Sequence, residues 1–264
     1  MLRLGSAIEQ LLLIRERMGW LYGSEDLCVL LYSIVKRERP SLIIELGTGL
    51  GVSTAWMAAA LKENARGLIH TYDNGSHYLS DPSKRFLADM DAPISELASA
   101  TSGGITFEGF IGNLMRWVGV EEHVVVHHQD IQFQEVARDK VFLQGIDLLF
   151  SDFNHAPENI QKLLGAFLPS MAPTSSIFID SASTHRLSYL ALERIVADLN
   201  RNKLPVGLTE HLSDEQFSTL ARRVQGSHFR LMHLVETHSR AQNSTAWLRI
   251  EPVDIVPTNA TFFH

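Results

Sequence analysis

The sequence predicts an α/β fold built on a doubly wound sheet of seven strands, mostly parallel, with an antiparallel strand near the C-terminus. Short continuous apolar runs alternate with segments of helical periodicity, which is typical of parallel strands covered by helices on both faces. After Pro205 the order changes, and two apolar runs follow each other with only Glu236–Ser244 between them. So short a link indicates antiparallel pairing, because a parallel crossover needs about a dozen or more residues.

Length and composition limit the function classes. The chain has 264 residues, and 45% of them are hydrophobic, which is enough for one large domain or one domain with an appendage. The net charge is -7 and no run of five basic residues occurs, so we expect a small-molecule partner and no nucleic acid. Cys28 is the single cysteine, which excludes an internal disulfide and favours a reducing, cytoplasmic location.

The first residues predict a helical cap over residues 1–38, ahead of a catalytic domain over 39–264. Apolar positions at helical spacing run from about Ser6 to Lys36 and are interrupted near Ser24, which indicates two helices. The first is amphipathic and is broken by charged residues, unlike a leader peptide, and it is a candidate surface for a homodimer. No uncharged apolar stretch reaches eighteen residues, so we expect no membrane span.

The remaining elements are predicted from the same patterns. Strands are expected at Leu42–Leu46, Leu68–Tyr72, Val124–His128, Ile146–Phe150, Ile177–Ile179, Phe229–Val235 and Ala246–Ile250. Helices are expected near Val52–Leu61, Phe107–Val118, Pro157–Leu168, Arg186–Asn200 and Asp214–Val224. The segment Gly75–Gly104 inserts about thirty residues where a short helix would suffice. Such an insert is either a binding lid or a surface elaboration without function.

A glycine-rich turn follows the first predicted strand, in the stretch IIELGTGLGVST. Glu45 ends the strand, and Gly47, Gly49 and Gly51 lead into the next helix. Backbone N–H groups gather at a helix N-terminus, and the absence of side chains lets a ligand lie against the backbone. The alternative is a tight turn without a ligand. A nicotinamide site would need G-x-G-x-x-G, whereas this chain has G-x-G-x-G.

The motif E-x-G-x-G-x-G resembles the first motif of class I S-adenosylmethionine-dependent methyltransferases, which have a Rossmann-like fold. The resemblance covers about Leu42–Ile250. It implies that Glu45 and the turn Gly47-Thr48-Gly49, continued to Gly51, hold the methionine part of S-adenosylmethionine. The carboxylate of Glu45 would then attract the cationic end of the cofactor.

Two further strand ends agree with the resemblance. Asp73 ends the second strand, where a carboxylate can accept both ribose hydroxyls. Its alternative role is to start a turn before Asn74. The resemblance places Gln129 and Asp130, after the third strand, near the adenine; Asp130 is otherwise an ordinary residue at a strand end.

The next strand end predicts the reaction site. Asp152-Phe153-Asn154-His155 resembles the D-x-x-H stretch of small-molecule O-methyltransferases, in which the aspartate meets metal or substrate and a histidine serves as general base. The imidazole of His155 suits that role because it titrates near neutral pH. The alternative is that His155 caps the helix beginning at Pro157.

Metal use is doubtful from the sequence. Metal-dependent members of the family carry two adjacent ligands after the following strand, whereas here Asp180 is followed by Ser181. A hydroxyl is a poor ligand for a hard cation, although Asp152 and Asp180 could hold Mg²⁺ with waters. Without a metal, hydrogen bonds would orient the substrate, from Asp152, Asn154, His155, Asp180, Ser181 and Ser183. His185 is a weaker candidate for substrate contact, and Trp20 for covering the cleft.

The sequence therefore predicts a methyltransferase for the hydroxyl or amine of a small, natural-product-type molecule. Three alternatives remain. The cofactor's own amine could close a ring and release methylthioadenosine, which would make the protein a cyclase. The less favoured alternatives are an NAD(P)-dependent oxidoreductase and a non-catalytic binding module.

Overall fold

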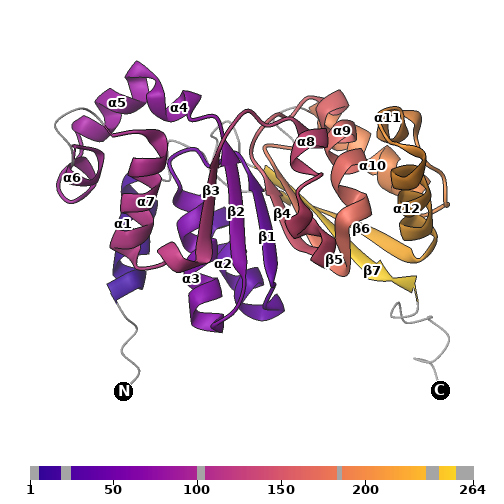
Figure 1. The fold of residues 1–264 in the computed structure, drawn as a ribbon, viewed down its shortest axis with the longest axis horizontal. Helices are drawn as coiled ribbons and strands as arrows, with labels where there is room; N and C mark the ends of the chain where they lie inside the picture. The colour runs from indigo at the N-terminus through magenta and orange to yellow at the C-terminus, as the bar shows by residue number, and fades with distance from the viewer. Residues whose placement is uncertain (1–5, 19–24, 100–104, 183–185, 236–243, 254–264) are drawn as a thin grey trace. The chain divides into compact units, whose positions relative to one another are not determined.

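A computed structural model describes residues 6–18, 25–99, 105–182, 186–235 and 244–253 (Figure 1). The chain forms two compact units. Unit 1 comprises Met1–Ile131 with Glu236–Asn243, and unit 2 comprises Gln132–Val235 with Ser244–His264. The boundary between a helical cap and a catalytic domain after residue 38 stays a prediction.

Unit 1 contains three parallel strands in the order β3-β2-β1. They are β1 (Leu42–Leu46), β2 (Leu68–Asp73) and β3 (Val124–His128), which confirms the predicted strands to within one residue. β1 is buried throughout, as expected for a strand covered on both faces, whereas β3 is half-buried to exposed. β3 lies at the end of this row, so its apolar side chains are less covered than their sequence indicates.

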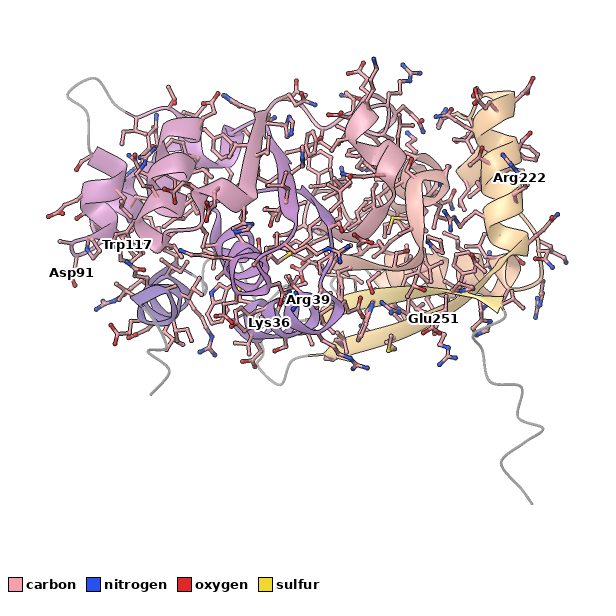
Figure 2. The ribbon with its side chains drawn as sticks, turned by 60° about the horizontal axis from the view of Figure 1, so that its bottom comes forward. Lys36, Arg39, Asp91, Trp117, Arg222 and Glu251 are labelled. Carbon is pink, nitrogen blue, oxygen red and sulfur yellow. The ribbon has the colours of Figure 1, made fainter. Side chains whose placement is uncertain are left out.

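Four longer helices pack in unit 1: α1 (Ser6–Met18), α2 (Glu25–Glu38), α3 (Val52–Asn64) and α7 (Phe107–Val118). α1 and α2 confirm the two predicted N-terminal helices. α1 is anchored to α7 by the Gln10 side-chain amide, which donates to the Trp117 carbonyl at 2.8 Å. α2 is joined to α3 by an ion pair of 3.1 Å between Lys36, labelled in Figure 2, and Glu63.

The described part of the insert is helical. It forms α4 (Ser76–Leu79), α5 (Asp81–Ala88) and α6 (Ile94–Ser99), which the sequence analysis did not predict (Figure 1). Ser80 caps α5 by accepting the N–H of Ser83 at 3.4 Å, and Pro82 lies in its first turn. Ser80 and Pro82 are thus the signal that could have located α5, since both residue types favour helix starts.

Unit 2 contains four strands in the order β4-β5-β7-β6. They are β4 (Ile146–Ser151), β5 (Met171–Asp180), β6 (Ser227–Val235) and β7 (Ser244–Pro252). β4 and β5 are parallel, and β7 is antiparallel to both β5 and β6, which confirms the predicted change of direction. β5 begins well before the predicted start at Ile177. The sequence did not indicate the first half of this strand, because it contains Pro, Thr and Ser, has two exposed residues and shows no apolar run.

Unit 2 also contains several helices. They are α8 (Phe133–Val136), α9 (Pro157–Phe167), α10 (Arg186–Leu199), α11 (Val206–Thr209) and α12 (Asp214–Gln225), with short 3₁₀ segments at Lys140–Gln144 and Leu168–Ser170. α12 begins with a capping box of Ser213 and Gln216. Within the described ranges, no helix combines the length and the apolar character that crossing a membrane requires.

Candidate active site

The glycine turn after β1 has a backbone that other residues adopt only with strain. Gly47, Gly49 and Gly51 have φ values of 94°, 56° and 79°, in the left-handed region. The N–H of Gly47 donates to the Tyr72 carbonyl at the end of β2 (2.9 Å), and the N–H of Gly51 donates to the Thr48 carbonyl (2.8 Å). The turn is therefore tied to β2 and to itself before α3 begins.

Gly51 packs closely against the side chains of α7. A Cβ atom at this position would lie 3.1 Å from Ile111 Cδ1 and 3.1 Å from Met115 Cε, both on α7. The close approach of α7 accounts for a glycine at this position, and a part for Gly51 in binding the cofactor stays a prediction.

Glu45 lies fully buried beneath the turn. Its carboxylate accepts hydrogen bonds from Ser53 Oγ (2.6 Å) and Thr54 Oγ1 (2.5 Å) in the first turn of α3, and from Thr71 Oγ1 (2.6 Å) on β2. Thr71 Oγ1 is also 2.5 Å from Thr48 Oγ1, so Thr48 donates to Thr71 when Thr71 donates to the carboxylate. Glu45 therefore joins β1, β2, α3 and the glycine turn.

The environment of Glu45 favours its neutral form. Burial raises the pKa of its carboxyl to about 7, although the three hydroxyl bonds oppose that shift. The three hydroxyl donors were not identified from the sequence, and the Ser53-Thr54 pair directly after the motif is the signal that could have indicated two of them.

Asp73, at the end of β2, joins two turns. Its Oδ2 accepts the N–H of Gly49 at 3.0 Å, and its Oδ1 accepts the N–H of Gly75 at 2.7 Å. The bond to Gly75 is the turn-initiating role considered as an alternative. A carboxylate has about four acceptor sites, so Asp73 retains capacity for two ribose hydroxyls.

Gln129 and Asp130 lie beside the same turn, after β3. The Gln129 N–H donates to the Asp73 carbonyl at 2.9 Å, and Asp130 Oδ1 accepts the Asn74 side-chain amide at 2.9 Å. Both side chains are exposed. Unit 1 thus brings together all the predicted cofactor-binding residues around the ends of β1, β2 and β3.

Unit 2 carries the predicted reaction residues. Asp152 follows β4, and its Oδ1 lies 3.6 Å from His155 Nε2, with side chains 23% and 13% exposed. This distance suits an ion pair once the imidazole is protonated. Asn154 Oδ1 accepts the N–H of Ala156 at 3.2 Å, so Asn154 rather than His155 supports the start of α9.

Asp180 ends β5 and is buried. It accepts Thr245 Oγ1 at 2.9 Å and Ser181 Oγ at 3.3 Å. Burial, followed by the nearby charge of Asp152, raises the pKa of Asp180 well above its usual range. The shift favours the neutral form of Asp180. Thr245 was not predicted as a site residue, since nothing in the sequence of β7 distinguishes its hydroxyl.

Asp180, one of the two candidate magnesium ligands, already has two hydroxyl partners. In the described part of the chain, no group of three or more His, Cys, Asp and Glu side chains is arranged to hold a metal ion. The oxygens of Asp180 receive hydroxyl hydrogens, and Ser181 points its hydroxyl at this carboxyl instead of presenting a lone pair to a cation. Ser181 also has φ 55°, a strained conformation for a residue with a side chain.

His127 and His128, the last two residues of β3, have different partners. His127 stacks on Tyr72 with ring centroids 4.2 Å apart, whereas His128 contacts Glu108 and Asn74. The two histidines thus have separate partners, as expected for neighbours on a strand. Ser183, His185 and Trp20 lie outside the described residues.

A family model described as a methyltransferase domain matches residues 44–182, which is more than half of the chain. The chain belongs to this methyltransferase family. The match includes the glycine turn, Asp73 and Asp130 in unit 1 and extends through Asp180 in unit 2. The methyltransferase predicted from the sequence is thereby confirmed. No curated protein matches this methyltransferase.

Solved structures with low sequence identity share the fold of this methyltransferase. A methyltransferase of Podospora anserina with bound S-adenosylhomocysteine has a TM-score of 0.51 at 12% identity, covering 93% of this chain and 88% of the other. The O-methyltransferase TomG of Streptomyces achromogenes, involved in tomaymycin synthesis and solved with S-adenosylmethionine, has a TM-score of 0.50 at 15% identity. The match covers 94% of this chain and 91% of TomG. An O-methyltransferase of Bacillus cereus in complex with S-adenosylhomocysteine has a TM-score of 0.50 at 13% identity, and the match covers 95% of this chain and 93% of the other. These similarities confirm the predicted Rossmann-like fold class.

Proposed function

We propose that this methyltransferase transfers a methyl group from S-adenosylmethionine to a hydroxyl or amine of a small molecule. The observation that carries the proposal is the junction at Asp73, where one carboxylate closes the glycine turn after β1 and the turn after β2. The family match and the ligands named for the similar structures support the cofactor.

The residues of unit 1 fit this cofactor. Asp73 has acceptor capacity for ribose hydroxyls, and the exposed Gln129 and Asp130 offer polar groups for the adenine. The glycine turn presents backbone beside the buried carboxyl of Glu45. When bound, S-adenosylmethionine supplies an electrophilic methyl group on a positively charged sulfur.

The residues of unit 2 supply proton handling. His155 receives the proton of the attacking hydroxyl or amine at Nε2, and the Asp152 carboxylate at 3.6 Å stabilises the resulting imidazolium. Burial and the charge of Asp152 favour the neutral form of Asp180. In that form Asp180 orients the acceptor molecule by hydrogen bonding and does not place a second negative charge beside Asp152. Asn154 shapes the turn before α9.

The acidic composition supports a small acceptor. With a net charge of -7, the chain offers little attraction to the phosphates of nucleic acid, whereas a compact acceptor needs no basic surface. Dimer formation through α1 stays a prediction.

The test is the identity of the nucleoside product. Purified protein is incubated with S-adenosylmethionine and fractionated metabolite extract, with and without a chelator, and the products are identified by mass spectrometry. Methyl transfer yields S-adenosylhomocysteine together with an acceptor whose mass has increased by one methylene. We expect the chelator not to change the yield of either product. Methylthioadenosine would instead establish the cyclase. Absence of both, with no heat of binding for S-adenosylhomocysteine, would overturn the proposal.

A further inference from the structure

His128, the last residue of β3, lies between two elements of unit 1. Its Nδ1 is 2.6 Å from Glu108 Oε1 on α7, and its Nε2 is 2.9 Å from the carbonyl oxygen of Asn74, in the turn after β2. The side chain is 33% exposed. Gln129 and Asp130, which follow it in sequence, were assigned to the cofactor, whereas His128 was given no role.

Both partners of the ring are hydrogen-bond acceptors. A peptide carbonyl has no hydrogen to donate, and a carboxylate has none when ionised. A neutral imidazole donates from one nitrogen only, so its other lone pair would face an oxygen at hydrogen-bond distance. The geometry is satisfied at both nitrogens when His128 is an imidazolium.

The charges around His128 agree with this protonation state. The bond to Glu108 raises the pKa of His128, as do the Asn74 carbonyl and the charge of Asp73, while partial burial opposes them. The pKa of Glu108 is lowered, first by a backbone hydrogen bond in the first turn of α7 and further by His128. The ring of Phe107, with its centroid 5.4 Å away, covers the imidazole from the side.

The Asn74 carbonyl belongs to the turn that carries the candidate ribose residue, Asp73, and that contacts the candidate adenine residue, Asp130. Asp73 Oδ1 accepts the Gly75 N–H within this turn, and the Asn74 side chain donates to Asp130. A Cβ at Gly75 would lie 3.1 Å from His128 Nε2, so the turn packs closely on the ring. Release of the Asn74 carbonyl would therefore disturb the groups on either side of it.

We propose that His128, in its doubly protonated form, is a positioning residue for the cofactor: it holds the Asn74 carbonyl to α7 and so fixes the turn that presents Asp73 and hydrogen-bonds Asp130. The inference rests on the proposed function of this turn. His128 acts through the turn, so loss of its proton weakens cofactor binding. The pKa of His128 is raised in the folded protein. His128 therefore keeps its second proton throughout the pH range in which an ordinary histidine titrates, and loses it as the pH rises past the raised pKa.

The experiment measures the charge of His128 and cofactor affinity separately. The imidazole resonances of wild-type protein are titrated by NMR from about pH 5 to about pH 10, a range that brackets ordinary histidine titration. The dissociation constant of S-adenosylhomocysteine is measured by calorimetry over the same range. The variants are Glu108→Gln, which keeps an acceptor but removes its charge, and His128→Gln. The control is Glu122→Gln, which removes a carboxylate 3.9 Å from His123 at the other end of β3.

In the wild type, His128 should titrate above the usual histidine range, and affinity should weaken about tenfold across the same transition, as expected for losing one charged hydrogen bond. Glu108→Gln should move both transitions to lower pH together, His128→Gln should bind weakly without this transition, and Glu122→Gln should match the wild type. Comparing profiles between variants removes the contribution of Glu45, which is common to all of them.

Two results would overturn the inference. One is a His128 that titrates in or below the usual range in the wild type. The other is a Glu108→Gln affinity profile parallel to that of the wild type despite a shifted His128 titration. Failure of the wild type to bind S-adenosylhomocysteine at any pH would instead remove the proposed function, and the positioning role with it, whatever the NMR titration shows.

Discussion

Asp73 Oδ2 accepts the backbone N–H of Gly49 at 3.0 Å, so the acidic end of β2 directly holds the glycine turn that follows β1. The two motifs that the sequence separates by a helix are one hydrogen-bonded unit. The other oxygen of Asp73 accepts Gly75 at 2.7 Å. A change at Asp73 therefore affects two turns at once, together with the ribose contact proposed for it.

We expect Asp73→Asn to weaken S-adenosylhomocysteine binding by about ten- to a hundredfold, because an amide has a single acceptor oxygen and hydrogen bonds to charged groups contribute roughly 1.5–3 kcal/mol each. Calorimetric titration measures the change. Asp89→Asn, at the exposed end of α5, is the matched control and should bind as the wild type does. Equal affinities for the two variants would exclude Asp73 from the site.

Glu45 makes the stability of the fold depend on pH. Its pKa is raised from 4.5 to about 7 by burial, so the folded state binds the proton more tightly than the unfolded chain. The free energy of unfolding should fall by roughly 3 kcal/mol as the pH rises from about 4.5 to about 7 and change no further from this group above that range. Glu45→Gln should lack this component. Urea unfolding of both proteins over the range tests it, and a constant difference between them would contradict the expectation.

His155 and Asp152 should affect the chemical step more than cofactor binding. We expect His155→Gln to lower kcat by about 10²- to 10⁴-fold, the usual contribution of a positioned general base, and Asp152→Asn to have a smaller effect in the same direction. Calorimetry with S-adenosylhomocysteine should give wild-type affinity for both. His211→Gln, an exposed histidine of unit 2, is the control. A loss of affinity as large as the loss of kcat would point to a binding role.

Gly51 and Gly112 should respond to substitution by alanine in opposite ways. Gly51→Ala combines a φ of 79° with a Cβ 3.1 Å from two side chains of α7, so we expect a destabilisation of about 1–3 kcal/mol. Gly112 lies on α7 with no atom within 4 Å of an added Cβ, so Gly112→Ala should stabilise by roughly 0.5–1 kcal/mol. Thermal unfolding of the two variants distinguishes these signs, and stabilisation by Gly51→Ala would refute the packing argument.

The parts of the molecule that follow a local pattern were predictable from the sequence. The buried strand β1, the helix α7 and the turn at Gly47–Gly51 each show their structure in the spacing of apolar residues or glycines. The hydroxyl network under Glu45 was not predictable, because Thr71 approaches Thr48 only once β1 and β2 pair. Thr245 and Asp180 likewise meet through the pairing of β7 with β5, which no sequence spacing encodes.

The insert that contains α4, α5 and α6 begins at Gly75 and ends at Thr106, and a Cβ at Gly75 would lie 2.9 Å from Phe107 Cβ, directly after the second point. Everything assigned to the nucleoside in unit 1 precedes the first of these points or follows the second. The intervening segment also packs on unit 1, because the ring of Tyr78 stacks on Phe110 of α7 with centroids 5.0 Å apart. We expect its exposed face to vary among related enzymes more readily than this buried contact.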